Sequence, residues 1–273
     1  VSISADAVRE CAERGIPIHF VSGTGSAYAS VYSSGLTGTV LTRRAQLEAF
    51  RDGRGLSIAI AFASGKIQNQ ANLLKYMGMY RKETAPQLYE ELRLRADEVA
   101  DAIIDLENIR RRPEFLEEGR TLIDDWREEI MGMEGRAAQR YWGAIKQVLP
   151  EHYGWQGREG RGATDPVNGA LNYGYGILYG RVEQALVLAG LDPYGGFAHA
   201  DRPGKPSLTL DFIEEFRQPV VDRTIFGLVN KGVKLEQDEH HRFTRETARL
   251  IAEKINERLE SNEPYEGKRH PLR

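Results

Sequence analysis

The feature that most constrains this chain is the helical spacing of its apolar residues, which dominates from about residue 57 onward. After Pro86, for example, Leu92, Val99, Ile103 and Leu106 recur at steps of seven, four and three residues. Such spacing lines one face of an α-helix. The pattern predicts helices over 57–82, 86–112, 114–131, 133–148 and 242–260, and so a chain that is mostly α-helical.

The first 65 residues have a different character. The segments 15–23 and 37–42 have β-type composition with glycine at or near their ends, and 1–4 has the composition of a strand already under way. A short helix over 5–14 is closed by Gly15. The sequence therefore predicts a mostly α, α+β fold, in which a small, incomplete β-rich N-terminal domain (1–65) precedes a large all-α domain (66–273).

A loop rich in glycine and charge, 150–164, precedes a well-marked helix start. Asp165 is suited to cap that helix, and Pro166 takes the first helical position, where its missing N–H costs nothing. The helix runs to about 190 and holds several glycines, each of which lowers helix stability by roughly 1 kcal/mol relative to alanine. So many glycines indicate close approach of another backbone or a ligand.

Composition limits the class of protein. The net charge is −3, there is one cysteine, and no apolar run is long enough to cross a membrane. A disulfide framework and a cysteine-based zinc site are excluded, and a cytoplasmic protein is expected. The start at Val1 suggests that a segment upstream has been removed or fused elsewhere. Basic residues are dense locally, at 110–112, 136–146 and 158–161, which is compatible with phosphate contacts or with ordinary solvated faces.

One carboxylate lies where an apolar residue is expected. Glu134 shares a helical stripe with Trp126, Ile130, Ala138 and Ile145. A carboxylate that faces the interior is costly unless it is paired, hydrogen-bonded or bound to a metal. Gly132 also offers a simpler explanation, because a break in the helix at that position would shift the phase.

A second group of candidates follows a Gly-Gly-aromatic turn. His199 is followed by a helix-like run in which Asp211, Glu214 and Glu215 lie at i, i+3 and i+4. These residues are either a loop histidine and a solvated acidic helix, or metal ligands. One imidazole with two or three carboxylates would suit Mg²⁺ or Mn²⁺ better than structural zinc.

Several segments together resemble the CRISPR-associated integrase family, whose members insert new spacers during CRISPR adaptation. They are "KIQNQANLL", "MEGRAAQRYW", "SLTLDFIEEFRQPVVDR" and "DPVNGALNYGYGILYGRVEQALVLAGLDPYGGFAH". The resemblance spans nearly the whole chain. It implies a β-sandwich-like N-terminal domain and an α-helical catalytic domain.

The resemblance also implies a metal site. The family's glutamate, histidine and acidic ligand fall on Glu134, His199 and Glu214, with Asp211 as a further ligand or a support. Six basic residues could bind DNA: Arg136, Arg140, Arg158, Arg161, Arg202 and Lys205. Three others could line the site: Asn168, Tyr173 and Glu215.

The implied reaction is metal-dependent transesterification, in which the 3′-hydroxyl of a captured DNA duplex attacks a phosphodiester at the CRISPR leader–repeat junction. The implied partners are double-stranded DNA, a second copy of the chain, a small CRISPR-associated adaptor protein that bridges two dimers, and an iron–sulfur exonuclease, fused or bound. Two rivals remain: a general metal-dependent nuclease of branched DNA, and a catalytically silent DNA-binding scaffold subunit.

Overall fold

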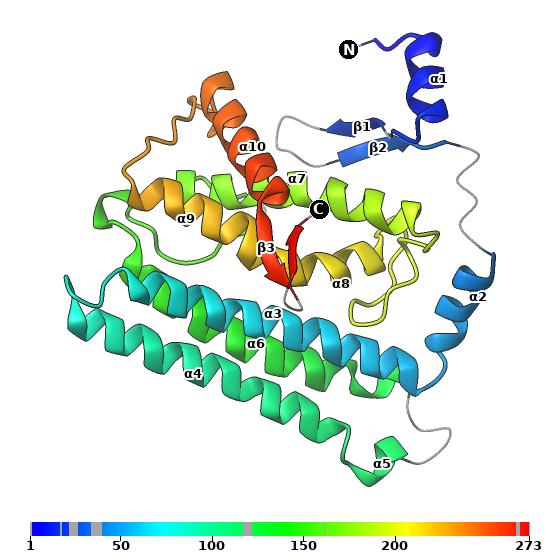
Figure 1. Ribbon diagram of the computed structural model, residues 1–273, viewed down its shortest axis with the longest axis horizontal. Coiled ribbons are helices and arrows are strands. Elements are labelled where there is room, and N and C mark those ends of the chain that lie inside the picture. The colour runs from blue at the N-terminus through cyan, green and yellow to red at the C-terminus, as the bar shows by residue number, and fades with distance from the viewer. Residues whose placement is uncertain are drawn as a thin grey trace.

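The computed structural model describes residues 2–16, 18–21, 27–33, 40–116, 122–160, 162–265 and 268–272. Its body consists of two helical layers (Figure 1). One layer contains the long helices α3 (Gly53–Met79), α4 (Pro86–Ile109) and α6 (Ile123–Val148). The other contains α7 (Pro166–Leu188), α8 (Ser207–Phe216), the π-helix η2 (Arg217–Asp222) and α9 (Arg223–Asn230). The described part of the chain is therefore mostly helical, as the sequence predicts.

Helix α3 contacts α4 and α6 within its own layer, and α8 and η2 in the other layer. It is buried along its length because its apolar residues cover more than one face: Leu56, Ile67 and Leu74 share one face, and buried Phe62 and Leu73 lie about a quarter turn away. Asp52 begins the helix by accepting a hydrogen bond from the Arg54 amide at 2.9 Å. Two polar residues of this helix, Lys66 and Gln70, therefore lie inside the protein.

Helix α7 confirms its predicted start, whereas the close neighbours of its glycines are side chains and not the predicted backbone or ligand. The Asp165 side chain accepts a hydrogen bond from the Asn168 amide at 2.8 Å, and Pro166 is the first helical residue. At Gly174, a Cβ atom would lie 2.6 Å from Val221 and 2.8 Å from Ile255. Any larger residue would push η2 and α10 (Arg245–Glu260) away from α7.

The N-terminal part is a small unit beside α7 (Figure 1). It contains α1 (Ala5–Glu13) and a two-stranded antiparallel hairpin of β1 (Ile18–Val21) and β2 (Ala27–Val31), which pairs Ile18 with Val31. Gly15, at φ +65°, follows α1 as predicted. The expected strand at 1–4 is wrong where it is described, because Ser2–Ser4 form no strand and Ser4 caps α1.

Two other predictions of secondary structure are wrong. The segment 37–42 was expected to be a strand, but α2 (Val40–Ala49) begins inside it, and 37–39 lie outside the described residues. Between 114 and 148, two long helices were expected to meet near Gly132. Instead, a short α5 (Pro113–Leu116) is followed by the single helix α6, since Gly132 continues the helical hydrogen bonding. Packing of α6 against α3 and α4 outweighs the low helix propensity of one glycine.

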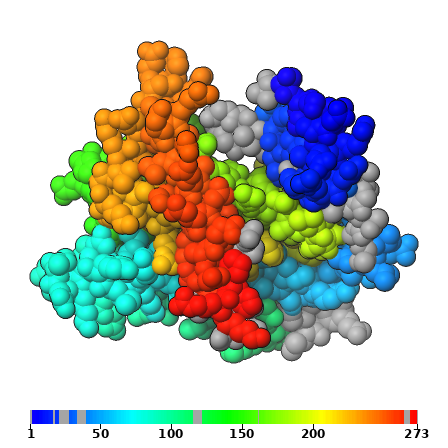
Figure 2. Space-filling model, turned by 45° about the horizontal axis from the view of Figure 1, so that its top comes forward, coloured from blue at the N-terminus to red at the C-terminus, as the bar shows by residue number. Residues whose placement is uncertain are grey.

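The remaining elements are short. Before α7 lies the 3₁₀ turn η1 (Glu151–Tyr153), and after α10 lies the hairpin of β3 (Asn262–Tyr265) and β4 (Lys268–Pro271). Figure 2 shows α10 and this hairpin running across one face of the molecule. Residue 65, the predicted domain boundary, lies inside α3. In the parts of the chain that the structure describes, no helix is both long and apolar enough to cross a membrane.

Candidate metal centre

Three helices bring charged side chains to one buried point between the two layers. The ammonium group of Lys66, on α3, contacts Oε1 of Glu134, on α6, and lies 2.6 Å from Oε2 of Glu214, on α8. Arg217, on η2, adds a second cation, with its Nη1 2.8 Å from Oε1 of Glu214. Two of the acidic residues predicted from the sequence, Glu134 and Glu214, therefore meet at one cation.

The electrostatics of this group balance burial against pairing. Lys66 and Glu214 are 9% and 5% exposed. Burial by itself would raise the pKa of Glu214, but the nearby charges of Lys66, Arg217 and His199 outweigh it and lower that pKa. Burial would likewise lower the pKa of Lys66, but Glu214 and Glu134 outweigh it and raise that pKa. Lys66 and Glu214 are thus held in their charged forms at neutral pH.

Asp211, one turn before Glu214, is directed at the loop that carries His199. Its carboxylate accepts hydrogen bonds from the backbone N–H groups of Phe197 (2.6 Å), Ala198 (3.0 Å) and His199 (2.8 Å). It also binds Nδ1 of the His199 ring at 2.7 Å. Because the carboxylate can only accept, Nδ1 carries a proton, and in the neutral imidazole Nε2 keeps its lone pair.

The His199 loop is also held by close packing and by Arg127. A Cβ atom at Gly196 would lie 2.5 Å from the Ser207 carbonyl carbon, so only glycine lets the loop rest on the start of α8. The guanidinium of Arg127, on α6, donates to the carbonyl oxygens of Ala198 (3.1 Å) and Phe197 (3.2 Å). The imidazole is therefore positioned by two separate elements, α8 and α6.

A buried polar network continues from Glu214 through η2. The Arg217 guanidinium stacks over the ring of Tyr175 at 4.9 Å, and the Tyr175 hydroxyl donates to Asp222. Tyr141, on α6, donates to the other oxygen of Asp222 at 2.7 Å. Burial raises the pKa of Asp222 to about 6, although the two tyrosine hydrogen bonds act in the opposite direction. π-Helical segments often occur at functional sites, and this one carries both Arg217 and Asp222.

The donor set fits a hard divalent cation. Two carboxylates converge on one positive charge, and His199 lies close enough to Glu214 to affect its pKa. A free Nε2, with Nδ1 held by a carboxylate, is the arrangement commonly found for metal-binding histidines. In the present arrangement, no three His, Cys, Asp or Glu side chains of the described residues gather as ligands of one ion. Lys66 supplies the cation between Glu134 and Glu214.

The other predicted site residues fall into three groups. Arg136 and Arg140 are exposed on α6, and Arg202 and Lys205 are exposed in the loop after His199. Arg158 is bound by protein, because its guanidinium donates to Asn168 (3.2 Å) and Asn172 (2.6 Å) and stacks over Tyr175. Arg161 lies outside the described residues.

Three further residues were predicted to line the site. Asn168 is buried and fastens the 157–159 loop to α7, through bonds to the Gly157 carbonyl (2.8 Å) and the Glu159 amide (3.0 Å). Tyr173 packs edge-on against Phe243. Glu215 is partly buried, burial raises its pKa, and its backbone carbonyl accepts a bond from Asn69 on α3 at 2.8 Å.

Sequence reasoning did not single out Lys66, Arg127, Arg217 or Asp222. Lys66 could have been found from the sequence, because it lies in a long apolar helix. A charged side chain at a buried position of such a helix indicates a buried partner. The other three had no comparable signal, since each gains its role from a partner on another helix.

The comparisons agree on one family. A family model described as CRISPR associated protein Cas1 matches residues 1–257. The chain is 35% identical to "CRISPR-associated endonuclease Cas1 1" of Archaeoglobus fulgidus, over 98% of this chain and 78% of that protein. It is 37% identical to "CRISPR-associated endonuclease Cas1 1" of Pyrobaculum aerophilum, over 95% of this chain and 77% of that protein.

Solved structures show the same fold. A Cas1 protein from Thermotoga maritima matches with a TM-score of 0.73 and 22% identity, over 95% of this chain and 76% of that one. A casposase bound to integration product matches with a TM-score of 0.77 and 23% identity, over 99% of this chain and 71% of that one. The expected iron–sulfur exonuclease finds no support in these comparisons. The family match and the two archaeal relatives together establish that this chain belongs to the CRISPR-associated Cas1 family.

Proposed function

We propose that this protein is the metal-dependent DNA integrase and endonuclease of CRISPR adaptation. The observation that carries the proposal is the convergence of Glu134 and Glu214 on one buried cation, beside a histidine whose free nitrogen is set by Asp211. The names of the archaeal relatives, which are CRISPR-associated endonucleases, support the same activity. So does the fold shared with a casposase bound to integration product.

In the proposed reaction, the 3′-hydroxyl of a short DNA duplex attacks a phosphodiester at the CRISPR leader–repeat junction. The attacking oxygen forms a new P–O bond, and the bond from phosphorus to the 3′-oxygen of the target strand breaks. The proton of the attacking hydroxyl finishes on that leaving oxygen. The number of phosphodiester bonds is unchanged, so no nucleotide cofactor is needed.

Glu134, Glu214 and Nε2 of His199 are the proposed holders of Mg²⁺ or Mn²⁺. The ion, when bound, supplies Lewis-acid stabilisation of the negative charge that develops on the phosphoryl oxygens. Asp211 acts as a support, since it fixes the tautomer of His199 and holds its loop. Arg217 balances the charge of Glu214 and orients that carboxylate through the 2.8 Å ion pair.

The proposed partners follow from this reaction. Exposed Arg136, Arg140, Arg202 and Lys205 are the proposed contacts to DNA phosphates, in a form of binding that weakens with salt. We also propose a homodimer, joined to a second dimer by the small adaptor protein. A solved complex of Cas6-RT-Cas1 with Cas2 contains a chain of the same fold, with a TM-score of 0.71 over 97% of this chain, which supports an assembly of that kind.

The test is an integration assay with the adaptor protein, a duplex with 3′-hydroxyl ends, supercoiled CRISPR DNA and Mn²⁺. Glu134→Ala and His199→Ala are expected to lose integration. Glu128→Ala, which changes an exposed glutamate on the same helix, is expected to keep it. Integration by Glu134→Ala at the wild-type rate would refute the site, and cleavage of branched duplexes without joining would favour a general nuclease.

A further inference from the structure

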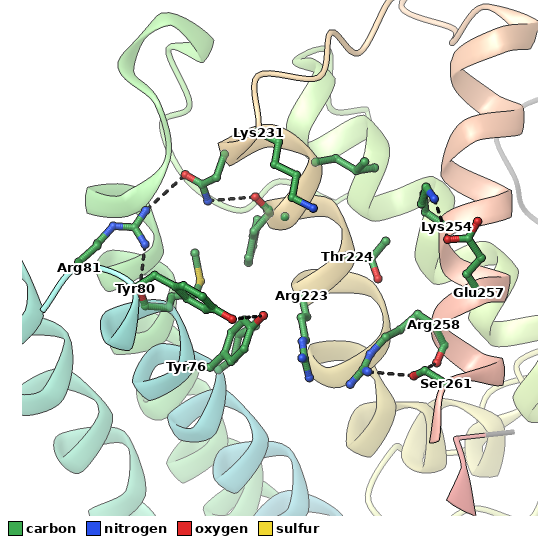
Figure 3. Close-up of a pocket in the computed structure, with 16 residues that line it drawn as sticks. Tyr76, Tyr80, Arg81, Arg223, Thr224, Lys231, Lys254, Glu257, Arg258 and Ser261 are labelled. Carbon is green, nitrogen blue, oxygen red and sulfur yellow. Dashed lines mark hydrogen bonds and ion pairs between the residues drawn. The ribbon is translucent and has the colours of Figure 1, made fainter. Parts of the chain in front are cut away.

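A pocket of about 610 Å³, separate from the candidate metal centre, lies between α9, α10 and the C-terminal end of α3 (Figure 3). Its apolar lining includes Leu73, Met77, Phe226 and Leu228. Tyrosine and basic side chains surround this apolar part, and none of them was singled out in the sequence. The volume is in the range that accommodates one small ligand or one nucleotide of a longer chain.

The pocket carries an excess of positive charge. Its basic residues come from the turn after α3, from α9 and the residue after it, and from α10: Arg81, Arg223, Lys231, Lys254 and Arg258. Glu257 pairs with Lys254 at 2.7 Å, and Glu263 pairs with Arg258 and lies 3.9 Å from Arg223. Two carboxylates thus face five cations, an imbalance that favours an anionic ligand.

Two of these cations have no acidic partner among the residues that the structure describes. The Arg81 guanidinium donates only to neutral oxygens, of Met77 (2.9 Å), Val148 (3.2 Å) and Asn230 (3.4 Å). Lys231 is exposed at the end of α9, and no described carboxylate pairs with it. Unpaired basic groups of this kind are the ones that gain most from a phosphate.

Aromatic rings stand beside these charges. Tyr80 is 70% exposed, and its ring meets Tyr76 edge-on, with 5.1 Å between the ring centres. Arg223 stacks over the other tyrosine ring, with its guanidinium carbon 4.3 Å from the centre of Tyr76. In Figure 3, Tyr76 and Arg223 lie next to one another in the pocket. An exposed ring beside stacked arginine is the combination that binds unpaired bases and their phosphates.

We propose that this pocket is a subsite for single-stranded DNA. One base stacks on Tyr80, and the flanking phosphates are bound by Arg81, Arg223 and Lys231. An acidic peptide would use the same charges but would not need an exposed ring. That the bound strand is DNA rests on the proposed function. That the pocket binds a single strand is argued from its own residues alone.

One helical run connects the pocket with the candidate metal centre. Glu214 and Arg223 lie on the continuous helical run from α8 through η2 to α9, nine residues apart. At a helical rise of 1.5 Å per residue, this is about 13 Å, or a few nucleotide steps.

The test measures binding of a fluorescein-labelled twelve-nucleotide oligothymidylate by anisotropy, in EDTA, with the full chain. Tyr80→Ala is expected to weaken binding about five-fold or more, and Tyr80→Phe, which keeps the ring, is expected to bind like wild type. Lys231→Ala is expected to weaken binding and to reduce its salt dependence, whereas Arg93→Ala, on the outer face of α4, is expected to do neither. Tyr80 and Lys231 are exposed, so these changes should leave folding intact.

The location is checked with an oligonucleotide that carries 5-iododeoxyuridine, whose photocrosslink should map to residues 76–81. Wild-type affinity in Tyr80→Ala, or equal losses in Lys231→Ala and Arg93→Ala, would overturn the proposal. Displacement of the oligonucleotide by polyglutamate as readily as by unlabelled oligothymidylate would overturn it in favour of an acidic protein partner. The oligonucleotide assay contains no divalent metal, so a failure of the metal-centre assignment is measured separately, in the integration assay.

Discussion

The side-chain nitrogen of Lys66 lies 2.6 Å from Oε2 of Glu214, and the same nitrogen contacts Glu134. A lysine thus holds together the two carboxylates that are proposed to bind a divalent ion. Since both carboxylates are shielded from solvent, the charge that neutralises them has a large effect on stability.

Lys66→Met is expected to destabilise the protein in EDTA. Loss of one partner from a buried ion pair costs about 3 kcal/mol or more, because the remaining charges are left uncompensated. Added Mn²⁺ is expected to stabilise this variant more than the wild type, since the ion no longer competes with an ammonium group. Urea unfolding with and without Mn²⁺ measures both effects.

Lys75→Met is the matched control on the same helix. Lys75 pairs with Asp97 at 2.8 Å, but both side chains are about half exposed, so its loss should cost less than about 1 kcal/mol. Equal stability of Lys66→Met and wild type in EDTA would show that the buried ion pair does not neutralise the site.

Asp211→Asn is expected to lower Mn²⁺ affinity and integration by roughly ten- to one hundred-fold. The amide removes the negative charge that accepts three backbone N–H groups and the His199 Nδ1–H, so the imidazole loses its fixed orientation. Titration with Mn²⁺, followed by electron paramagnetic resonance, measures affinity independently of activity.

Asp238→Asn is the control for a general effect on loops. Asp238 accepts the backbone N–H groups of His240 and Arg242 at 2.8 and 2.9 Å, in an exposed turn. Its replacement should leave Mn²⁺ affinity unchanged. An Asp211→Asn variant with wild-type Mn²⁺ affinity would contradict the supporting role of Asp211.

Asp222 is expected to make stability fall as the pH rises from about 4 to about 6. Its folded-state pKa is about 6, above the ordinary value of 3.8, so in this range the folded state binds more protons than the unfolded state. Asp222→Asn removes this titration. The free energy of unfolding of the variant, relative to wild type, should therefore increase across that pH range and then level off.

The opposite slope is expected for Asp238, because backbone hydrogen bonds, led by that from Arg242, lower its pKa. Its stabilising contribution is present above the unfolded pKa and is lost as the pH falls. Urea titrations at several pH values, for Asp222→Asn and Asp238→Asn side by side, distinguish the two signs. A flat difference between Asp222→Asn and wild type would show that Asp222 does not titrate in this range.

Arg140→Ala is expected to weaken binding to duplex DNA at low salt and to reduce the slope of log affinity against log salt by about 0.9. Arg140 is exposed on α6, with no carboxylate partner in the described part of the chain. Arg93→Ala removes the same charge from α4 and should leave the slope unchanged. Identical slopes for Arg140→Ala and wild type would exclude Arg140 from the DNA contact.

Much of the helical framework could be predicted because its signals are local. The apolar spacing after Pro86, the Asp165 cap and the glycine after α1 each act within a few residues, and each is found in the structure. The strand predicted at 37–42 is wrong because its local signal is too short to be decisive. A short apolar run does not by itself distinguish strand from helix, and Val40 begins α2.

The sequence by itself determined which stretches become helices and which acidic residues deserved attention, since helical spacing and an out-of-place carboxylate are properties of neighbouring residues. Only the tertiary structure decided that Lys66 joins Glu134 to Glu214, and that Asp211 faces the His199 loop. These contacts join residues between 12 and 148 positions apart, on separate elements. Their geometry depends on how α3, α6 and α8 pack together, and no local pattern in the chain specifies that packing.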